Sequence, residues 1–149
     1  MFTHICFVLS AIALCIFSVH AKEECGPTNT RDLNFIFMTC AKEHDVTDAQ
    51  IKTATELEDV TFVKACFWAC CLRKTGFLDK KGRYVLYPGL TYIRYIVKRD
   101  DVYTDLETIA KQCESVNDMA LKYEETGCER SSLVAACFME QMDQIRFFI

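Results

Sequence analysis

The cysteines are the residues of this chain whose side chains could take part in the widest range of chemistry. The sequence contains ten of them. Cysteines form disulfides, bind metals as thiolates or act as nucleophiles. An even number of them in a short secreted chain indicates a disulfide framework, although eight cysteines allow roughly a hundred pairings and the count alone does not choose among them. Apart from Cys6 and Cys15, all follow the apolar start of the chain: Cys25, Cys40, Cys66, Cys70, Cys71, Cys113, Cys128 and Cys137.

Catalysis and metal binding, the alternatives to disulfides, would need partner residues that this sequence lacks. After residue 21 the only histidine is His44, so a catalytic triad has a single candidate base. Zinc is disfavoured because the cysteines have no matching histidine or second Cys-x-x-Cys pair. Cys70 and Cys71 begin like the Cys-Cys-x-x-His-x-x-Cys helix of secreted phospholipases A2, but Lys74 and Phe77 replace its histidine and last cysteine. We therefore predict no enzyme, no metal and no other cofactor.

The start of the chain predicts a secretory signal. The apolar run from Ile5 to Val19 covers about 15 residues, fewer than the roughly 20 of a membrane-spanning helix. The small residue Ala21 precedes a sharply polar stretch, which indicates cleavage after it. We expect residues 1–21 to be the signal and residues 22–149 to form one secreted, extracellular domain. The formal charge of −4 argues against nucleic acid or an anionic membrane surface as partner.

Helices are expected to hold the cysteines in place. The chain has only two prolines, and no segment sustains the alternation of a half-buried strand. We predict an all-α, compact bundle of about six helices. The stretch 65–72 has no polar face for two turns, so the helix that contains it should be the buried centre of the bundle. The expected spans are 31–43, 47–57, 59–75, 88–97, 103–116 with a bent continuation toward 127, and 131–145.

Six of the cysteines have the spacing of a known framework. Intervals of 25, 3, 42, 14 and 8 residues separate the successive members Cys40, Cys66, Cys70, Cys113, Cys128 and Cys137. This series resembles the six-cysteine signature of the insect odorant-binding proteins, the pheromone and general odorant-binding family. The resemblance covers nearly the whole chain after the signal. Agreement at five successive intervals is far more specific than a single Cys-x-x-x-Cys pair.

The resemblance implies an apolar cavity within the helical bundle, stapled by three interlocked disulfides. Helix geometry is compatible with that pairing. Cys66 and Cys70 lie one turn apart on one face, where they can reach two different neighbours but are poorly placed to bond each other. The implied bridges are Cys40–Cys70, Cys66–Cys128 and Cys113–Cys137.

Cys25 and Cys71 depart from the six-cysteine pattern. We predict a fourth bridge between them, which would tie the segment before the first helix to the far face of the third. The alternative is a pair of free thiols or intermolecular pairing, which an oxidising compartment makes less favourable.

Binding is the function that the resemblance implies. Ligand cavities are lined mostly by apolar and aromatic groups, and most such residues here are expected to be ordinary core. As cavity wall we predict Phe62, Ile93, Ile96, Phe138 and Met142, with Tyr92 or Tyr95 as a polar contact and Phe148 from the end of the chain.

The apolar end Phe147, Phe148 and Ile149 leaves two possibilities open. It folds inward as a wall or plug of the cavity, or it continues the last helix along the outside of the bundle. Ligand release by protonation of a histidine cluster is not expected, because His44 is the only histidine after the signal.

We therefore predict a secreted carrier that binds and solubilises small hydrophobic ligands such as odorants or pheromones. It is expected to be a monomer or weak homodimer, without nucleic acid or stable membrane insertion, and a membrane receptor is a further partner to consider. Two alternatives stay open. One is a salivary or reproductive-fluid scavenger on the same fold, and the other is a disulfide-rich signalling or toxin-like protein without a small ligand.

Overall fold

The computed structural model describes the backbone of residues 32–146 and the side chains of residues 32–142. Within these residues the chain forms six α-helices and two 3₁₀ turns, and its only β pairing is an isolated bridge between Leu78 and Tyr84. The predicted all-α bundle is therefore confirmed. The elements are α2 (Leu33–Glu43), α3 (Asp48–Glu56), η1 (Val60–Phe62), α4 (Ala65–Thr75), α5 (Gly89–Ile96), α6 (Asp100–Gln112), η2 (Cys113–Asp118) and α7 (Cys128–Arg146).

Local capping interactions set several helix ends. Before α2 the Asp32 carboxylate accepts a hydrogen bond from the backbone N–H of Asn34 at 2.9 Å. Thr47 and Gln50 form a reciprocal capping box at the start of α3. The helix α4 ends at Gly76, whose φ of 88° is a left-handed conformation that favours glycine. These caps decide where the chain turns and hence which helix faces meet.

The third predicted helix is shorter than expected. Asp59 does not open a continuous helix, because its carboxylate accepts a hydrogen bond from the Thr61 N–H at 2.9 Å and closes the separate turn η1. Val63 is then extended, and α4 begins only at Ala65. Residues 67–71 are all buried, so the apolar run does lie at the centre of the bundle as predicted.

The helices α6 and α7 begin earlier than predicted. The first residue of α6 is Asp100 rather than Tyr103, and two aspartates lie in its first turn, where the helix dipole favours carboxylates. The helix does not bend on toward Gly127, because η2 replaces it from Cys113 onward. Gly127 has a φ of 67° and ends the loop, so α7 starts at Cys128 rather than at residue 131.

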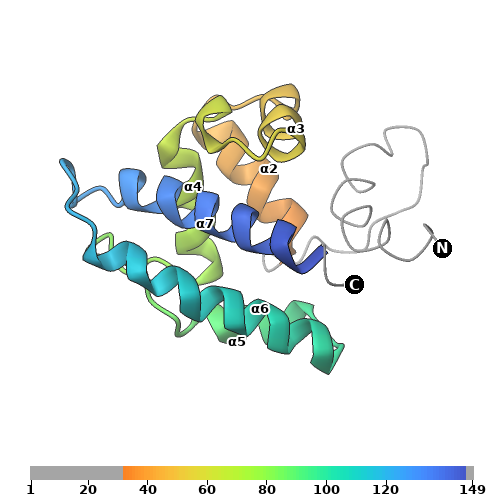
Figure 1. Cartoon of the computed structure of the whole chain (residues 1–149). Helices are drawn as coiled ribbons and strands as arrows, with labels where there is room; N and C mark the ends of the chain where they lie inside the picture. The colour runs from red at the N-terminus through yellow and green to blue at the C-terminus, as the bar shows by residue number, and fades with distance from the viewer. Residues whose placement is uncertain (1–31, 147–149) are drawn as a thin grey trace, which may run out of the picture.

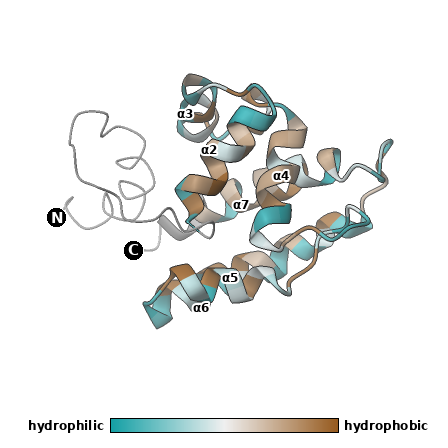
Figure 2. Ribbon diagram, turned by 180° about the vertical axis from the view of Figure 1, so that it is seen from behind, coloured by the Kyte–Doolittle hydropathy of each residue, from teal (hydrophilic) through white to brown (hydrophobic). Residues whose placement is uncertain are grey.

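The longest helix, α7, runs through the middle of the molecule (Figure 1). The helices α2 and α3 lie on one side of it and α5 and α6 on the other, whereas α4 crosses it from the first side to the second, an arrangement that Figure 2 shows from behind. Its most extensive packing is against α4. Because helices cover it on two sides, α7 has two buried faces.

Three disulfides join these layers, and they are the three implied by the resemblance. One connects α2 to α4, one connects α4 to α7, and one connects the start of η2 to α7. Every bridge therefore has at least one end on the two central helices. The bonded pairs are Cys40–Cys70, Cys66–Cys128 and Cys113–Cys137.

A buried arginine joins the first turn of α7 to two other segments. Arg130 is only 2% exposed. Its Nε donates to the Gly82 carbonyl at 3.1 Å and its Nη1 to the Val116 carbonyl at 3.0 Å. Gly82 reaches this position because its backbone lies close to that of Gly127. A Cβ on Gly82 would lie 2.8 Å from the Cα of Gly127. The exposed Glu124 carboxylate is 3.8 Å from the guanidinium.

Candidate functional site

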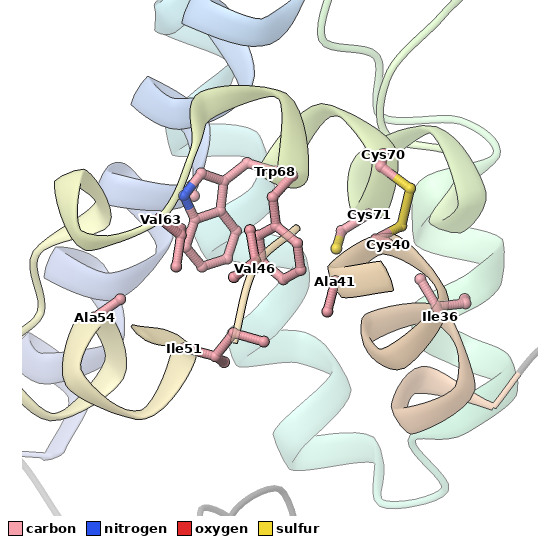
Figure 3. Close-up of a cluster of buried hydrophobic side chains, with 12 residues drawn as sticks. Ile36, Cys40, Ala41, Val46, Ile51, Ala54, Val63, Trp68, Cys70 and Cys71 are labelled. Atoms are coloured by element: carbon pink, nitrogen blue, oxygen red, sulfur yellow. A yellow bond between two sulfur atoms is a disulfide. The ribbon is translucent and has the colours of Figure 1, made fainter. Parts of the chain in front are cut away.

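Two apolar clusters form the core, one on each side of α7. We name them the upper and lower clusters, after their places in Figure 1. The upper cluster, part of which Figure 3 shows, comprises Ile36, Cys40, Ala41, Val46, Ile51, Ala54, Val63, Phe67, Trp68, Cys70, Cys71 and Ala135. The lower cluster comprises Phe77, Tyr84, Leu90, Ile93, Ala110, Val116 and Val134.

Adjacent residues of α5 and α7 belong to different clusters. On α7, Phe138 packs against the lower cluster and Met139 against the upper one. On α5, Ile93 belongs to the lower cluster, whereas Tyr92 packs against the upper one. Successive residues of a helix point about 100° apart, so each of these helices borders both clusters. We call this boundary the seam and define it by Tyr92, Ile93, Phe138 and Met139, together with Phe37 of α2, which packs like Tyr92 and Met139 against the upper cluster.

The seam retains accessible apolar surface. Ile93 is buried, but the other four side chains are only half-buried. The Phe37 ring meets the edge of Phe67 with centroids 5.7 Å apart, and the Phe138 ring meets that of Phe77 at 6.0 Å. Aromatic rings and a flexible methionine offer large apolar contact areas that can repack around a guest molecule.

Tyr92 supplies the polar group of the seam. Burial, together with the nearby charges of Asp32 and Tyr95, raises the pKa of the Tyr92 phenol to about 12. The phenol is therefore neutral at physiological pH and keeps its O–H proton. Among the seam residues it is the one side chain with a hydroxyl group, which suits it to orient a ligand by a hydrogen bond.

The structure brings together only some of the predicted wall residues. Tyr92, Ile93 and Phe138 lie at the seam, and Met142 is half-buried one helical turn after Phe138. Phe62 lies apart from them on η1 and is 41% exposed. Two further predicted residues are also exposed, namely Ile96 and Tyr95. Phe148 and the rest of the apolar chain end lie outside the described residues.

Sequence reasoning did not select Phe37 and Met139 as wall residues. A signal for Met139 existed, because α7 carries two apolar stripes, one through Val134 and Phe138 and one through Ala135 and Met139. Two stripes on one helix indicate two buried faces. For Phe37 the helical spacing indicates a buried face of its helix but not the helix that this face meets, which is α4.

Cys71 is a free, buried thiol in the described part of the chain. It lies beside the Cys40–Cys70 bridge and faces the upper cluster (Figure 3). Burial raises the pKa of the Cys71 thiol to about 12, against a smaller opposite effect of Lys74. Its predicted partner, Cys25, lies outside the described residues, so the fourth bridge stays a prediction.

Two concavities of the described residues lie away from the seam and are open to solvent. One is on α5 and the start of α6, and the other follows the loop 121–126. Neither of them is lined by a residue of the seam.

One group of possible metal ligands occurs among the described residues. Donor atoms of Glu43, His44 and Cys70 lie within 4.8 Å of one another. The sulfur of Cys70, however, is bonded to that of Cys40 and cannot act as a thiolate. The two side chains that remain do not make a zinc site of the usual four ligands.

Comparison with known proteins adds one finding. The sequence profile of the PBP/GOBP family matches residues 22–141, which include every residue of the seam and all three disulfides. No curated protein and no solved structure matches the chain. Among the described residues, no helix combines the length and apolar character that a membrane span requires.

Proposed function

Since this chain belongs to the PBP/GOBP family, the insect pheromone and general odorant-binding proteins, we propose that it is a secreted carrier of small hydrophobic molecules. The family binds and carries ligands and is not enzymatic, and this chain has the same role rather than a catalytic one. The signal predicted at residues 1–21 delivers it to the extracellular fluid, where disulfides persist. The ligand is a molecule with an extended apolar body.

The seam is the observation that carries this proposal. Four half-buried apolar or aromatic side chains lie there against the two clusters, and one of the four, Tyr92, carries a neutral phenol. The ligand inserts between α5 and α7 and displaces Phe138 and Met139, while the disulfides hold the surrounding helices. A methionine and a phenylalanine suit this role, because they offer adaptable apolar contacts. Tyr92 donates a hydrogen bond to an oxygen of the ligand.

Fluorescence of N-phenyl-1-naphthylamine tests the proposal directly. The folded protein is expected to bind this apolar probe, and Phe138→Ala should weaken binding about tenfold through the loss of aromatic contact. Tyr92→Phe should weaken competition by 1-dodecanol a few-fold and leave the probe itself unaffected, because only the alcohol accepts the hydrogen bond.

Leu57→Ala is the matched control, because Leu57 is an exposed apolar residue at the end of α3, away from the seam. It should leave both affinities unchanged. If native protein binds no apolar probe, or if Phe138→Ala binds as tightly as the unmodified chain while remaining folded, the seam is not the carrier site.

A further inference from the structure

A second concavity lies on the outer face of α5, separate from the seam. It is open to solvent and has a volume of about 400 Å³, within the range of about 300 to 1,000 Å³ that is usual for small-molecule sites. Three of its six lining residues are tyrosines, and its floor includes the buried Leu90. The lining residues are Tyr87, Leu90, Thr91, Arg94, Tyr95 and Tyr103.

The guanidinium of Arg94 contacts a carboxylate and an aromatic ring at this concavity. One terminal nitrogen donates to the Asp100 carboxylate at 2.6 Å, and the guanidinium carbon lies 4.9 Å from the centre of the Tyr103 ring. Arginine has five N–H donors, and Asp100 accepts from one of them in the described structure. A guanidinium with further donors is suited to a carboxylate, which it can bind through two parallel hydrogen bonds.

The tyrosines provide flat apolar surface beside this cation. Tyr87 is 75% exposed and Tyr95 is 42% exposed, a large exposure for aromatic rings that line one concavity. Rings of this kind stack against a planar aromatic guest. Lys98 adds a second positive charge nearby, with its Nζ 5.3 Å from the centre of the Tyr95 ring.

We propose that this concavity, between α5 and the start of α6, binds small aromatic carboxylates at a site separate from the carrier seam. The ring stacks on the tyrosines and the carboxylate binds Arg94. An aromatic amine is disfavoured, because Arg94 and Lys98 already lie over two of the three tyrosine rings and would repel it. A neutral alcohol gains the stacking alone.

Titration of ¹⁵N-labelled protein with phenylacetate tests the site, with 2-phenylethanol and phenethylamine as probes of equal ring size. The amide signals that shift with phenylacetate are expected in the segment 87–103. Arg94→Gln should weaken phenylacetate about tenfold or more, as expected for loss of a charge-assisted hydrogen bond. The same variant should change the affinity for 2-phenylethanol by less than twofold. Tyr87→Ala should weaken both.

Arg83→Gln is the charge-matched control, because Arg83 is an exposed arginine on a different turn. It should leave all three affinities unchanged, and circular dichroism should show each variant folded. Phenylacetate should also leave N-phenyl-1-naphthylamine bound, since the two ligands occupy different sites. The proposal is overturned if phenylacetate displaces that probe, if folded Arg94→Gln binds phenylacetate as the unmodified chain does, or if phenethylamine binds as tightly as phenylacetate.

Discussion

Replacement of Arg130 by methionine is the sharpest test of how the base of α7 is held. The arginine is 2% exposed and donates to two backbone carbonyls, those of Gly82 and Val116. Methionine keeps much of the side-chain length and its packing, but it has no N–H donors. The substitution therefore isolates the hydrogen bonds from the volume of the side chain.

The magnitude follows from the two hydrogen bonds. Each bond to a charged donor contributes roughly 1.5 to 3 kcal/mol, and each carbonyl left without a partner keeps its desolvation cost. Against this, methionine removes the cost of burying a guanidinium. We therefore expect Arg130→Met to lower the free energy of unfolding by about 3 kcal/mol, a large share of the roughly 5 to 15 kcal/mol of a typical domain. The corresponding fall in Tm is about 10 °C.

Guanidinium denaturation with the disulfides intact measures this effect. Arg83→Met is the control, because this exposed arginine has no comparable contacts and its loss should cost less than about 0.5 kcal/mol. Glu124→Gln should also cost less than about 1 kcal/mol, since its carboxylate is exposed and 3.8 Å from the guanidinium. A loss below about 1 kcal/mol for Arg130→Met would refute the view that these two hydrogen bonds anchor α7.

Three further predictions concern other polar groups that are buried or half-buried. Tyr84→Phe should cost about 1 kcal/mol in thermal unfolding, because the hydroxyl donates to the Ala110 carbonyl at 2.9 Å. Asn117→Ala should lower the free energy of unfolding in urea by about 2 kcal/mol, because the Asn117 side-chain amide forms hydrogen bonds with both the N–H and the carbonyl of Tyr84. With Cys25→Ser, folded Cys71 should react with DTNB roughly 100-fold more slowly than unfolded chain at pH 8. Burial raises the Cys71 pKa to about 12, whereas the pKa of the thiol in the unfolded chain is about 8.5. We compare the free energy of unfolding of the Cys25→Ser variant with that of its Cys71→Ala derivative. The difference should be constant below a pH of about 8.5, and the Cys25→Ser variant should lose stability relative to the derivative as the pH rises toward about 12. Equal DTNB reactivity of Cys71 in the folded and the unfolded chain would contradict its burial. Unchanged stability of Tyr84→Phe or of Asn117→Ala would contradict the hydrogen bonds that the substitution removes.

The disulfides and the central helix could be predicted because their signals are local or numerical. Intervals between cysteines are counted directly along the chain, and they carry the family resemblance that implied the three bridges, all of which are present. Likewise, a stretch of eight residues without a polar face has few places to lie other than the centre of a bundle. Both inferences need no knowledge of how distant helices cross.

Other features depend on distant contacts, which helical periodicity does not encode. Arg130 looks like an ordinary charged surface residue, and its burial follows only from the approach of Gly82 to Gly127. The predicted wall residue Phe62 is exposed because Asp59 closes a short turn before α4. Met139 lies at the seam because α7 borders both clusters. In each case the crossing of two elements decides the outcome, and the residue types alone do not.

The two disulfides of α7 are attached to its first half, so the two halves of the helix differ in their covalent attachment to the bundle. Both of its half-cystines, Cys128 and Cys137, lie in the first ten of its 19 residues. Beyond Cys137 the helix has no covalent attachment among the described residues, and Phe138 and Met139 stand at that point. At Phe138 and Met139, therefore, side-chain packing rather than a disulfide holds the helix against the bundle. In amide hydrogen exchange, protection should drop from the first half of α7 to the second, and a bound ligand should restore it only in the second half.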